Sequence, residues 1–345
     1  MKKSLIVMAA LAAMATATTA SAQTAPSSSV TLFGTIDVGL ARVTGDTLSR
    51  TGLSTSGANI SRIGFRGTED LGGGLAAGFW LEGGLDVNTG AGKTSGAFSF
   101  NRRATASLMG GFGEVRIGRD DSATFLNTLI FDPFLTNGVG GTGTFVMNGA
   151  PIQISNAVSY FLPANLGGFY GQAQVAFGGQ ASNSSTPNLG DYRGLRGGYR
   201  QGPIHVALAT GKLKGATAAA DVSANNIAGW YDFGVVKPSF IWASEKTATT
   251  KITAFQIGAS APIGASELRA SVGRYDTSGN NADWTKVSLG YGYNLSKRTQ
   301  LYTSYGHISN KAGAQRAINI QGLGAAGTTL GGTSSGYEVG MRHFF

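Results

Sequence analysis

The most persistent pattern in this chain is an alternation of apolar and polar side chains with a period of two residues. In segment 77–88, apolar residues take most odd positions, whereas Trp80, Glu82 and Asp86 share the opposite face. Successive side chains of a β-strand point to opposite faces, so the pattern predicts a strand with one apolar and one wet face. Similar segments recur from residue 30 onward, and many have the length of about 10 residues that a tilted strand needs to cross a bilayer. The polar face carries too many charges for a packed core, which favours a transmembrane antiparallel β-barrel with a water-filled lumen.

The connections between the predicted strands alternate in length, as they do in outer-membrane barrels. Short turns are predicted at 71–74, 110–111, 163–168, 201–203, 237–238, 262–264 and 294–298. Long connections rich in Gly, Ser, Thr and Asn are predicted at 44–58, 89–96, 178–190 and 311–335. The pattern predicts about sixteen strands, of which those near 113–119 and 191–200 are the hardest to place because element boundaries are the weakest part of such a prediction.

Several aromatic residues lie near predicted strand ends and are candidates for the interfacial girdles of a membrane barrel. They are Trp80, Tyr231, Trp242, Trp284 and Tyr337. The ordinary enrichment of aromatic side chains in strands explains their positions equally well.

The first residues have the features of an export signal. Two lysines precede the uncharged apolar run 5–13, and residues 20–22 (Ala-Ser-Ala) fit a small-x-small cleavage site. An apolar run this short argues against an uncleaved membrane anchor. We therefore expect residues 1–22 to be a cleaved signal peptide and residues 23–345 to form a single barrel domain in the outer membrane.

The last ten residues alternate as an amphipathic strand. Residues 336–345 place Tyr337, Val339 and Met341 on one face, opposite Glu338 and other residues of the second face. A strand that ended the fold in this way would leave an open edge in most architectures. In a closed barrel the last strand pairs with the first, so no edge remains.

Composition narrows the choice of compartment and partner. The chain has no Cys, so disulfides cannot supply its stability, and complete strand pairing around a barrel is a sufficient alternative. The net charge is +9, but Arg and Lys are scattered singly and form no basic patch. Nucleic acid is therefore not an expected partner, whereas a basic lumen or contact with outer-membrane lipid and lipopolysaccharide fits the charge.

The segment 61–75 (SRIGFRGTEDLGGGL) resembles the second strand and first periplasmic turn of Gram-negative general porins, especially those of β-proteobacteria such as Neisseria, Bordetella and Burkholderia. Further matches in the same order lie at 100–104, 111–113, 117–119, 293–299 and 340–345. The resemblance implies a homotrimer of sixteen-stranded barrels, each with its own pore, in which the third extracellular loop folds into the lumen. It also implies that Phe345 belongs to a signal for the barrel-assembly machinery.

The third long loop is expected from about Asp120 to Pro151, a stretch of low periodicity. Loops of this length are normally functional or disordered. In related porins the loop carries acidic residues that face arginines on the opposite wall, and Asp132 is the residue that matches here. The acidic residue that the family places directly after the following proline is absent, because position 134 is Phe.

The basic side of the expected constriction comes from the barrel wall. Arg62 and Arg66 share the lumen-facing parity of their strand, and Arg102 stands where the family places a wall arginine, with Arg103 as an alternative in a shifted register. We therefore predict a pore constriction formed by Arg62, Arg66, Arg102 and Asp132. Each arginine could instead brace the barrel by pairing with a nearby acid such as Glu82. Other lumen-facing arginines are expected to be offset by acids; these arginines are Arg116, Arg196, Arg269 and Arg342, and the acids are Asp37, Glu114, Glu267 and Glu338.

The function expected from these features is passive diffusion of ions and small hydrophilic solutes, with weak anion selectivity arising from charged rings in the pore. A substrate-specific channel for sugars or organic anions is the alternative; a barrel enzyme and an adhesive barrel with a closed lumen are less favoured. His205, His307 and His343 fall on separate strands, and no Cys is present, so no zinc-site spacing exists. No catalytic motif is present either. We expect no catalytic residues, metal or cofactor.

Overall fold

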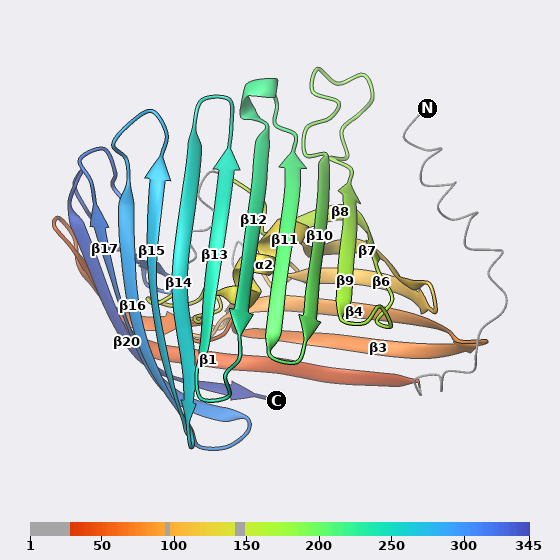
Figure 1. Ribbon diagram of the computed structural model, residues 1–345, viewed down its shortest axis with the longest axis horizontal. Helices are drawn as coiled ribbons and strands as arrows, with labels where there is room; N and C mark the ends of the chain where they lie inside the picture. The colour runs from red at the N-terminus through yellow and green to blue at the C-terminus, as the bar shows by residue number, and fades with distance from the viewer. Residues whose placement is uncertain (1–27, 94–96, 142–148) are drawn as a thin grey trace.

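The computed structural model describes residues 28–93, 97–141 and 149–345. The predicted signal peptide lies outside these residues. The structure is all β apart from short helices, and sixteen strands pair in antiparallel fashion into a closed barrel (Figure 1). This confirms the fold predicted from the alternation.

The wall strands follow the chain order around the barrel. They are β1 (Ser29–Gly45), β3 (Arg62–Gly72), β4 (Leu75–Asp86), β6 (Arg103–Gly110), β7 (Gly113–Asp121), β8 (Gln153–Phe161), β9 (Phe169–Ala176), β10 (Tyr192–Gln201), β11 (Ile204–Leu213), β12 (Val222–Tyr231), β13 (Lys237–Lys246), β14 (Lys251–Ile263), β15 (Ser266–Thr277), β16 (Trp284–Asn294), β17 (Thr299–Asn310) and β20 (Thr333–Phe344). The connections contain β2 (Arg50–Thr55), β5 (Ala91–Gly92), α2 (Ala123–Phe131), the 3-10 helix η3 (Ala218–Ala220), β18 (Asn319–Ile320) and β19 (Gly324–Ala325).

The barrel closes where β1 meets β20. Their antiparallel ladder runs from the pair Thr35 and Phe344 to the pair Gly45 and Ser334. One step further, the Gly34 N–H donates to the Phe345 carbonyl at 3.1 Å, and the Phe345 N–H donates to the Gly34 carbonyl at 3.2 Å. Because β20 also pairs with β17, no wall strand is left with a free edge.

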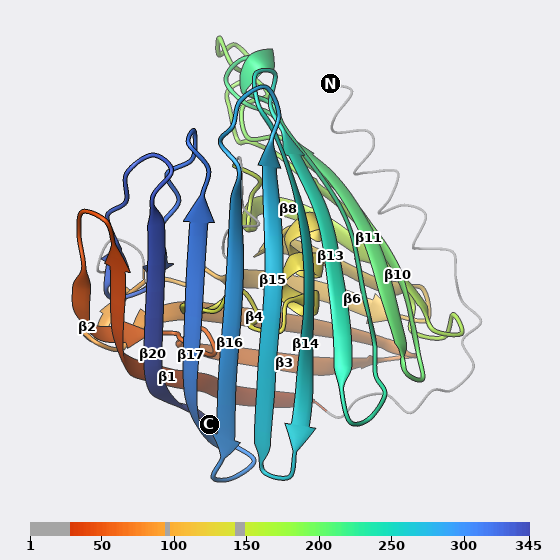
Figure 2. The ribbon, with the colours of Figure 1, turned by 60° about the vertical axis from the view of Figure 1, so that its left-hand side comes forward.

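Strand β11 shows how the alternation partitions the two faces. Ile204, Val206 and Leu208 are exposed by 40%, 40% and 59%, whereas His205 and Ala207 are almost completely buried. The apolar side chains are thus the exposed ones, as expected for the outer face of a barrel whose surroundings are lipid. Figure 2 shows the neighbouring strands β13 to β17 side by side.

Three sequence predictions about local structure were wrong. Residues 237–238, predicted as a turn, are instead the first residues of β13. The turn lies before them at Gly234, which has φ +81° and whose N–H donates to the Asp232 carboxylate at 2.8 Å.

Trp80 and Trp284 do not belong to an outer girdle. Trp80 lies over two arginines of the inner face, and Trp284 is 2% exposed because it stacks on another inward ring, as described below.

The segment between β7 and β8, residues 122–152, is called here the third-loop segment. Its helix α2 begins at Ser122, whose hydroxyl accepts the Phe125 N–H at 3.1 Å, and ends before Pro133, which disfavours helical backbone in the preceding residue. The helix contacts β9 to β13 (Figure 1). No helix in the described part of the chain is long and apolar enough to cross a membrane.

Candidate pore constriction

Glu82 is the acid that the wall arginines share. Its Oε1 lies 2.6 Å from Arg102 Nε and 3.7 Å from Arg62 Nη1, and its Oε2 accepts the Trp80 indole N–H at 3.1 Å. The Glu82 side chain is only 9% exposed. A charge-assisted hydrogen bond fixes the position of Arg102, whereas Arg62 lies at ion-pair distance from the same carboxylate.

Arg66 lies apart from this ion-pair cluster, among aromatic rings. Its guanidinium carbon is 5.4 Å from the centre of the Phe33 ring and 5.1 Å from that of Trp80. A cation over an aromatic face is stabilised by the ring quadrupole. Arg66 is therefore held along the wall by cation–π contacts, and no acid within ion-pair distance is recorded for it among the described residues.

Arg102 and Arg103 both approach the inner face. Arg102 precedes β6 and turns to Glu82, whereas Arg103 is the first strand residue, with the parity of the buried Thr105. The Arg103 guanidinium lies 4.4 Å from the Trp80 ring centre and 3.5 Å from Asp120 Oδ1.

A β-bulge positions this second acid. The ladder between β7 and β8 shifts register between Gly118 and Asp120, and Gly118 has φ +131°, a backbone conformation that side chains disfavour. The bulge lets Asp120 reach both Arg103 and Arg116, the latter at 2.6 Å.

Asp132 lies in a different environment. It is 1% exposed, and its carboxylate accepts the N–H groups of Phe134 at 3.2 Å and Thr136 at 2.8 Å. Gln256 of β14 donates its side-chain amide to the same carboxylate at 3.2 Å. Asp132 thus shapes the turn after α2 and fastens it to the wall, while Arg62 and Arg102 meet on Glu82. The structure does not bring these predicted residues together in one cluster.

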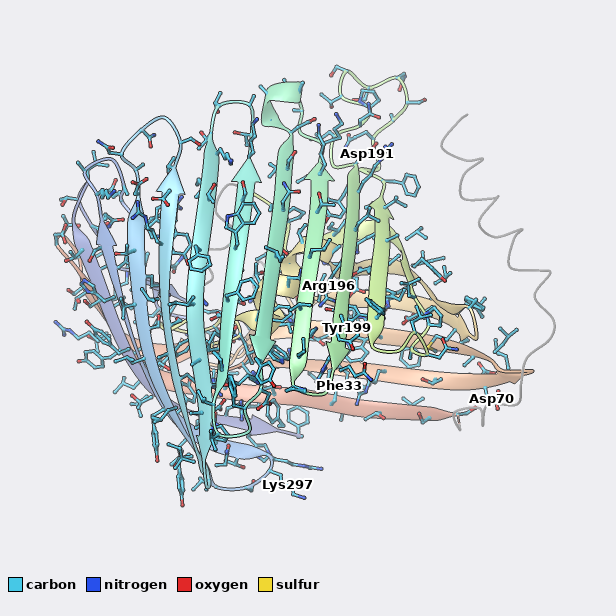
Figure 3. All side chains as sticks on the ribbon, in the orientation of Figure 1. Phe33, Asp70, Asp191, Arg196, Tyr199 and Lys297 are labelled. Carbon is cyan, nitrogen blue, oxygen red and sulfur yellow. The ribbon has the colours of Figure 1, made fainter. Side chains whose placement is uncertain are left out.

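The third-loop segment is held to the wall at two places. On one side, Asn127 of α2 donates to Asn226 Oδ1 at 2.9 Å and accepts from Arg196 Nε at 2.6 Å (Arg196 is labelled in Figure 3). On the other side, the Val139 N–H donates to the Glu338 carboxylate of β20 at 3.2 Å. The segment therefore joins β10 and β12 to the region where the barrel closes.

Asp37 and Glu338 organise that closing region. Asp37 accepts the backbone N–H groups of residues 57–59 at 2.7–3.0 Å and the Tyr302 hydroxyl at 2.7 Å. Glu338 also accepts the Ser54 hydroxyl at 2.7 Å. These two acids, on β1 and β20, hold the first long connection against the wall. They therefore act as loop anchors, and Asp37 also stands directly opposite Arg342, one of the arginines that these acids were expected to offset, in the ladder between β1 and β20.

The remaining inward arginines divide into paired and unpaired ones. Arg116 meets Glu114 at 2.8 Å and Arg269 meets Glu267 at 2.5 Å, so two of the expected acids offset two of the expected arginines. Arg196 has no recorded ion pair with a described acid, and hydrogen-bonds instead to Asn127 and to the Tyr170 hydroxyl, at 3.0 Å.

A cavity of about 780 Å³ lies beside the third-loop segment. Residues from the long connections and from the wall line it, among them Phe125, Thr128 and Gln315. Its charged lining residues are Lys93, Arg102, Lys286 and Arg316, and no Asp or Glu is among the described residues that line it. Basic lining residues favour anions over cations, and Glu82, which is bonded to Arg102, offsets part of this charge.

Three of these four cations were not singled out as site residues from the sequence. Lys286 has the inward parity of its strand, between the exposed Thr285 and Val287, so its position was visible in the alternation. It donates to the Gly141 carbonyl of the third-loop segment. Lys93 and Arg316 lie in long connections, where no periodicity indicates which way a side chain points.

Aromatic stacking fixes Arg316, and burial perturbs Lys93. The Arg316 guanidinium carbon lies 4.5 Å from the centre of the Trp284 ring, which stacks on Tyr275 with ring centres 4.7 Å apart. Burial and the neighbouring positive charge of Arg102 lower the pKa of Lys93 to about 8. Lys93 therefore carries its charge at neutral pH and loses it in mildly alkaline solution.

Comparisons with known proteins agree with this architecture. The model of the Gram-negative porin family matches residues 9–313. The chain is 38% identical to outer membrane porin protein 32 of Delftia acidovorans and 30% identical to an outer membrane porin protein of Bordetella pertussis, each alignment covering all of both chains. A solved structure described as an anion-selective porin from Comamonas acidovorans is 37% identical, with a TM-score of 0.86 over 92% of this chain and 100% of that one. The chain therefore belongs to the Gram-negative porins and is a β-barrel of the bacterial outer membrane.

Proposed function

We propose that this protein is a general diffusion porin that passes ions and small hydrophilic solutes, with a weak preference for anions. The observation that carries the anion preference is the cavity beside the third-loop segment, whose described charged lining residues are all basic. The relative from Comamonas acidovorans, itself described as anion-selective, supports the same preference.

The proposed constriction contains the residues predicted from the sequence, but the arginines and the aspartate have different roles in it. Arg62, Arg66 and Arg102 form the basic wall, and Asp132 keeps the third-loop segment in place so that it narrows the channel. Glu82 lowers the positive charge of the wall without cancelling it, because it serves two arginines. Lys93, Lys286 and Arg316 add to the positive field.

The test is the reversal potential of the purified mature protein in a planar lipid bilayer under a salt gradient. In the double variant R62Q/R102Q we expect a shift toward cations, with the anion-to-cation permeability ratio reduced about fivefold. This estimate takes each charge to contribute about 0.5 kcal/mol at about 8 Å in water. The matched control is K297Q/R298Q, which removes two charges from the exposed turn before β17.

Two results of that test would contradict two different parts of the proposal. A variant that conducts with an unchanged reversal potential would contradict the assignment of the arginines while leaving the porin intact. Absence of conductance in the folded wild-type protein would contradict diffusion through the barrel. It would favour the alternative of an adhesive barrel with a closed lumen.

A substrate-specific channel is the second candidate, favoured by the rigid stack of Arg316, Trp284 and Tyr275 beside the cavity. Aromatic and cationic side chains in a fixed arrangement suit sugars or organic anions. Saturable uptake that discriminates between solutes of equal size would support it, whereas uptake that depends only on size supports general diffusion.

The expected partners follow from membership of the family. We propose a homotrimer, recognition of Phe345 by the barrel-assembly machinery, and no catalytic activity, since the relatives are porins. Native gel mobility before and after boiling tests the trimer: one band that converts to a faster monomer on heating is expected, and monomer mobility without heating would contradict it.

A further inference from the structure

The end of helix α2 packs on a buried histidine of the wall. His205 of β11 has inward parity and is 3% exposed. The ring of Phe131, the last residue of α2, lies 4.7 Å from the imidazole and 4.9 Å from the Trp230 ring, measured between ring centres. Phe131 is itself 1% exposed. The last turn of α2 is therefore seated on His205 and Trp230.

The hydrogen bonds around His205 fit a neutral imidazole. The Tyr170 hydroxyl oxygen accepts from Arg196 Nη2 at 3.0 Å and lies 2.9 Å from His205 Nε2. Because a guanidinium group can only donate, the hydroxyl proton points at Nε2, which is then the acceptor. The imidazole proton is accordingly assigned to Nδ1, which is buried and has no hydrogen-bond partner among the described residues.

The charged groups recorded around His205 are basic. On β10, Arg200 is its direct cross-strand partner, and Arg196 reaches it through the hydroxyl group described above. On β12 the cross-strand partner is Trp230, whose ring centre lies 4.8 Å from Lys237 Nζ of β13. That ring therefore already holds a cation. Helix α2 carries no charged residue.

Two acids follow elements of this site in the sequence, and both have other partners. Asp132, after Phe131, accepts the N–H groups of its own turn and the Gln256 amide. Asp232, after β12, accepts the Gly234 N–H at 2.8 Å. No ion pair between His205 and an acid is recorded among the described residues.

A proton on His205 Nε2 would disturb this arrangement in two ways. It adds a positive charge to a buried site beside Arg196 and Arg200, and burial of an unpaired charge is costly. The new N–H also points at the Tyr170 hydroxyl proton, so the hydroxyl group has to turn away from its acceptor. Water would relieve both effects, and it reaches the imidazole when Phe131 moves off the ring.

We propose that His205 is an acid-sensitive latch for the third-loop segment. While the imidazole is neutral, Phe131 is seated on it and the end of α2 lies against the wall. On protonation Phe131 leaves, water reaches the imidazolium, and the end of α2 moves toward the lumen, which lowers the conductance. This latch rests on the proposed diffusion channel and adds a means of regulating it.

The direction of the pH dependence follows from proton linkage. The seated state holds a neutral imidazole, whereas the released state exposes an imidazole that takes up a proton near pH 6.5. Below that pH the released state binds one proton more than the seated state. The ratio of released to seated channels should therefore rise by up to about tenfold for each unit by which the pH falls.

The test is single-channel recording of the purified mature protein between pH 7 and pH 4 at constant salt. In the wild type we expect a low-conductance state whose population rises with that slope. H205Q keeps an acceptor for the Tyr170 hydroxyl group and takes up no proton, so its population of this state should stay at the pH 7 level. The control H343Q removes an exposed imidazole of β20 and should behave as the wild type.

A second variant changes the facing charge without altering the buried site. Arg200 is exposed, and R200Q removes a positive charge opposite His205, which makes protonation easier. The transition should move to higher pH by about 0.4 unit, the effect of two unit charges about 8 Å apart in water. The control R298Q removes a charge from an exposed turn and should leave the transition in place.

Three results would overturn the latch: channel states of the wild type that do not depend on pH, an equal pH response in H205Q, or an unchanged transition in R200Q. If H205Q does not fold, as judged by its mobility on gels before and after heating, the shift in R200Q decides the question. Absence of conductance in the wild type at pH 7 would overturn the diffusion channel together with the latch. A channel that conducts equally at every pH would overturn the latch alone.

Discussion

Glu82 and Asp132 are both nearly buried carboxylates, but different kinds of donor surround them. Glu82, on the wall, receives two arginines and an indole N–H, so its neighbours are charged side chains. Asp132, in the third-loop segment, receives two backbone N–H groups and a glutamine amide. The first carboxylate sets the charge of the wall, and the second sets the shape of a loop. The role of an acid in the third-loop segment therefore depends on the donors that surround it.

The largest expected effect comes from removing the loop brace. In D132A, three donors lose their acceptor, which should destabilise the folded protein by about 3 kcal/mol at about 1 kcal/mol for each donor. The third-loop segment should loosen, with larger and noisier channel openings, while D132N, which keeps one acceptor oxygen, should be affected less. Heat-induced unfolding on gels and single-channel recordings measure both effects. Wild-type stability in D132A would mean that Asp132 does not hold the loop.

A smaller effect, on selectivity alone, is expected from E82Q. The substitution keeps the size of the side chain and removes one negative charge, so the anion preference should increase about twofold, from about 0.5 kcal/mol for a unit charge at about 8 Å in water. Its direction is opposite to that of R62Q/R102Q. The reversal potential measures it, and a shift toward cations would show that Glu82 holds the arginines more than it offsets their charge.

The smallest expected effect is a dependence on pH. Since the pKa of Lys93 is about 8, its ammonium group is charged below that pH and neutral above it. The anion preference should therefore decrease between pH 7 and pH 9, by at most the contribution of one charge. The matched variant K93M should show the low, alkaline selectivity at both pH values. An equal pH response in K93M and the wild type would assign the titration to another group.

The barrel could be predicted from the sequence because period-two alternation is a local property. Within each strand, the alternation itself indicates which residues face lipid. Strands β7 and β10 lie near the predicted positions 113–119 and 191–200 although their patterns are weak. The turn at 237–238 was misplaced because a proline was taken as the turn signal, whereas Gly234, with its positive φ, makes the turn.

The pore could be predicted only in part. Wall residues such as Arg62 and Lys286 reveal their direction through parity, because a strand fixes the face of every second residue. Lys93, Arg316 and Asp132 lie in long connections, where contacts between segments distant in sequence decide the orientation. The hydrogen bonds between Asp132 and Gln256 or between Val139 and Glu338 link positions more than a hundred residues apart, and no local pattern encodes them.

The anchoring acids Asp37 and Glu338 also impose an order on assembly. They belong to β1 and β20, the two strands whose pairing closes the ring, and they hold residues 57–59 and Val139 in place. In an unclosed sheet these two acids lie on separate edges, so the first long connection can bind Asp37 through residues 57–59 but can bind Glu338 through Ser54 only after closure. Closure of the wall therefore completes the fastening of this connection.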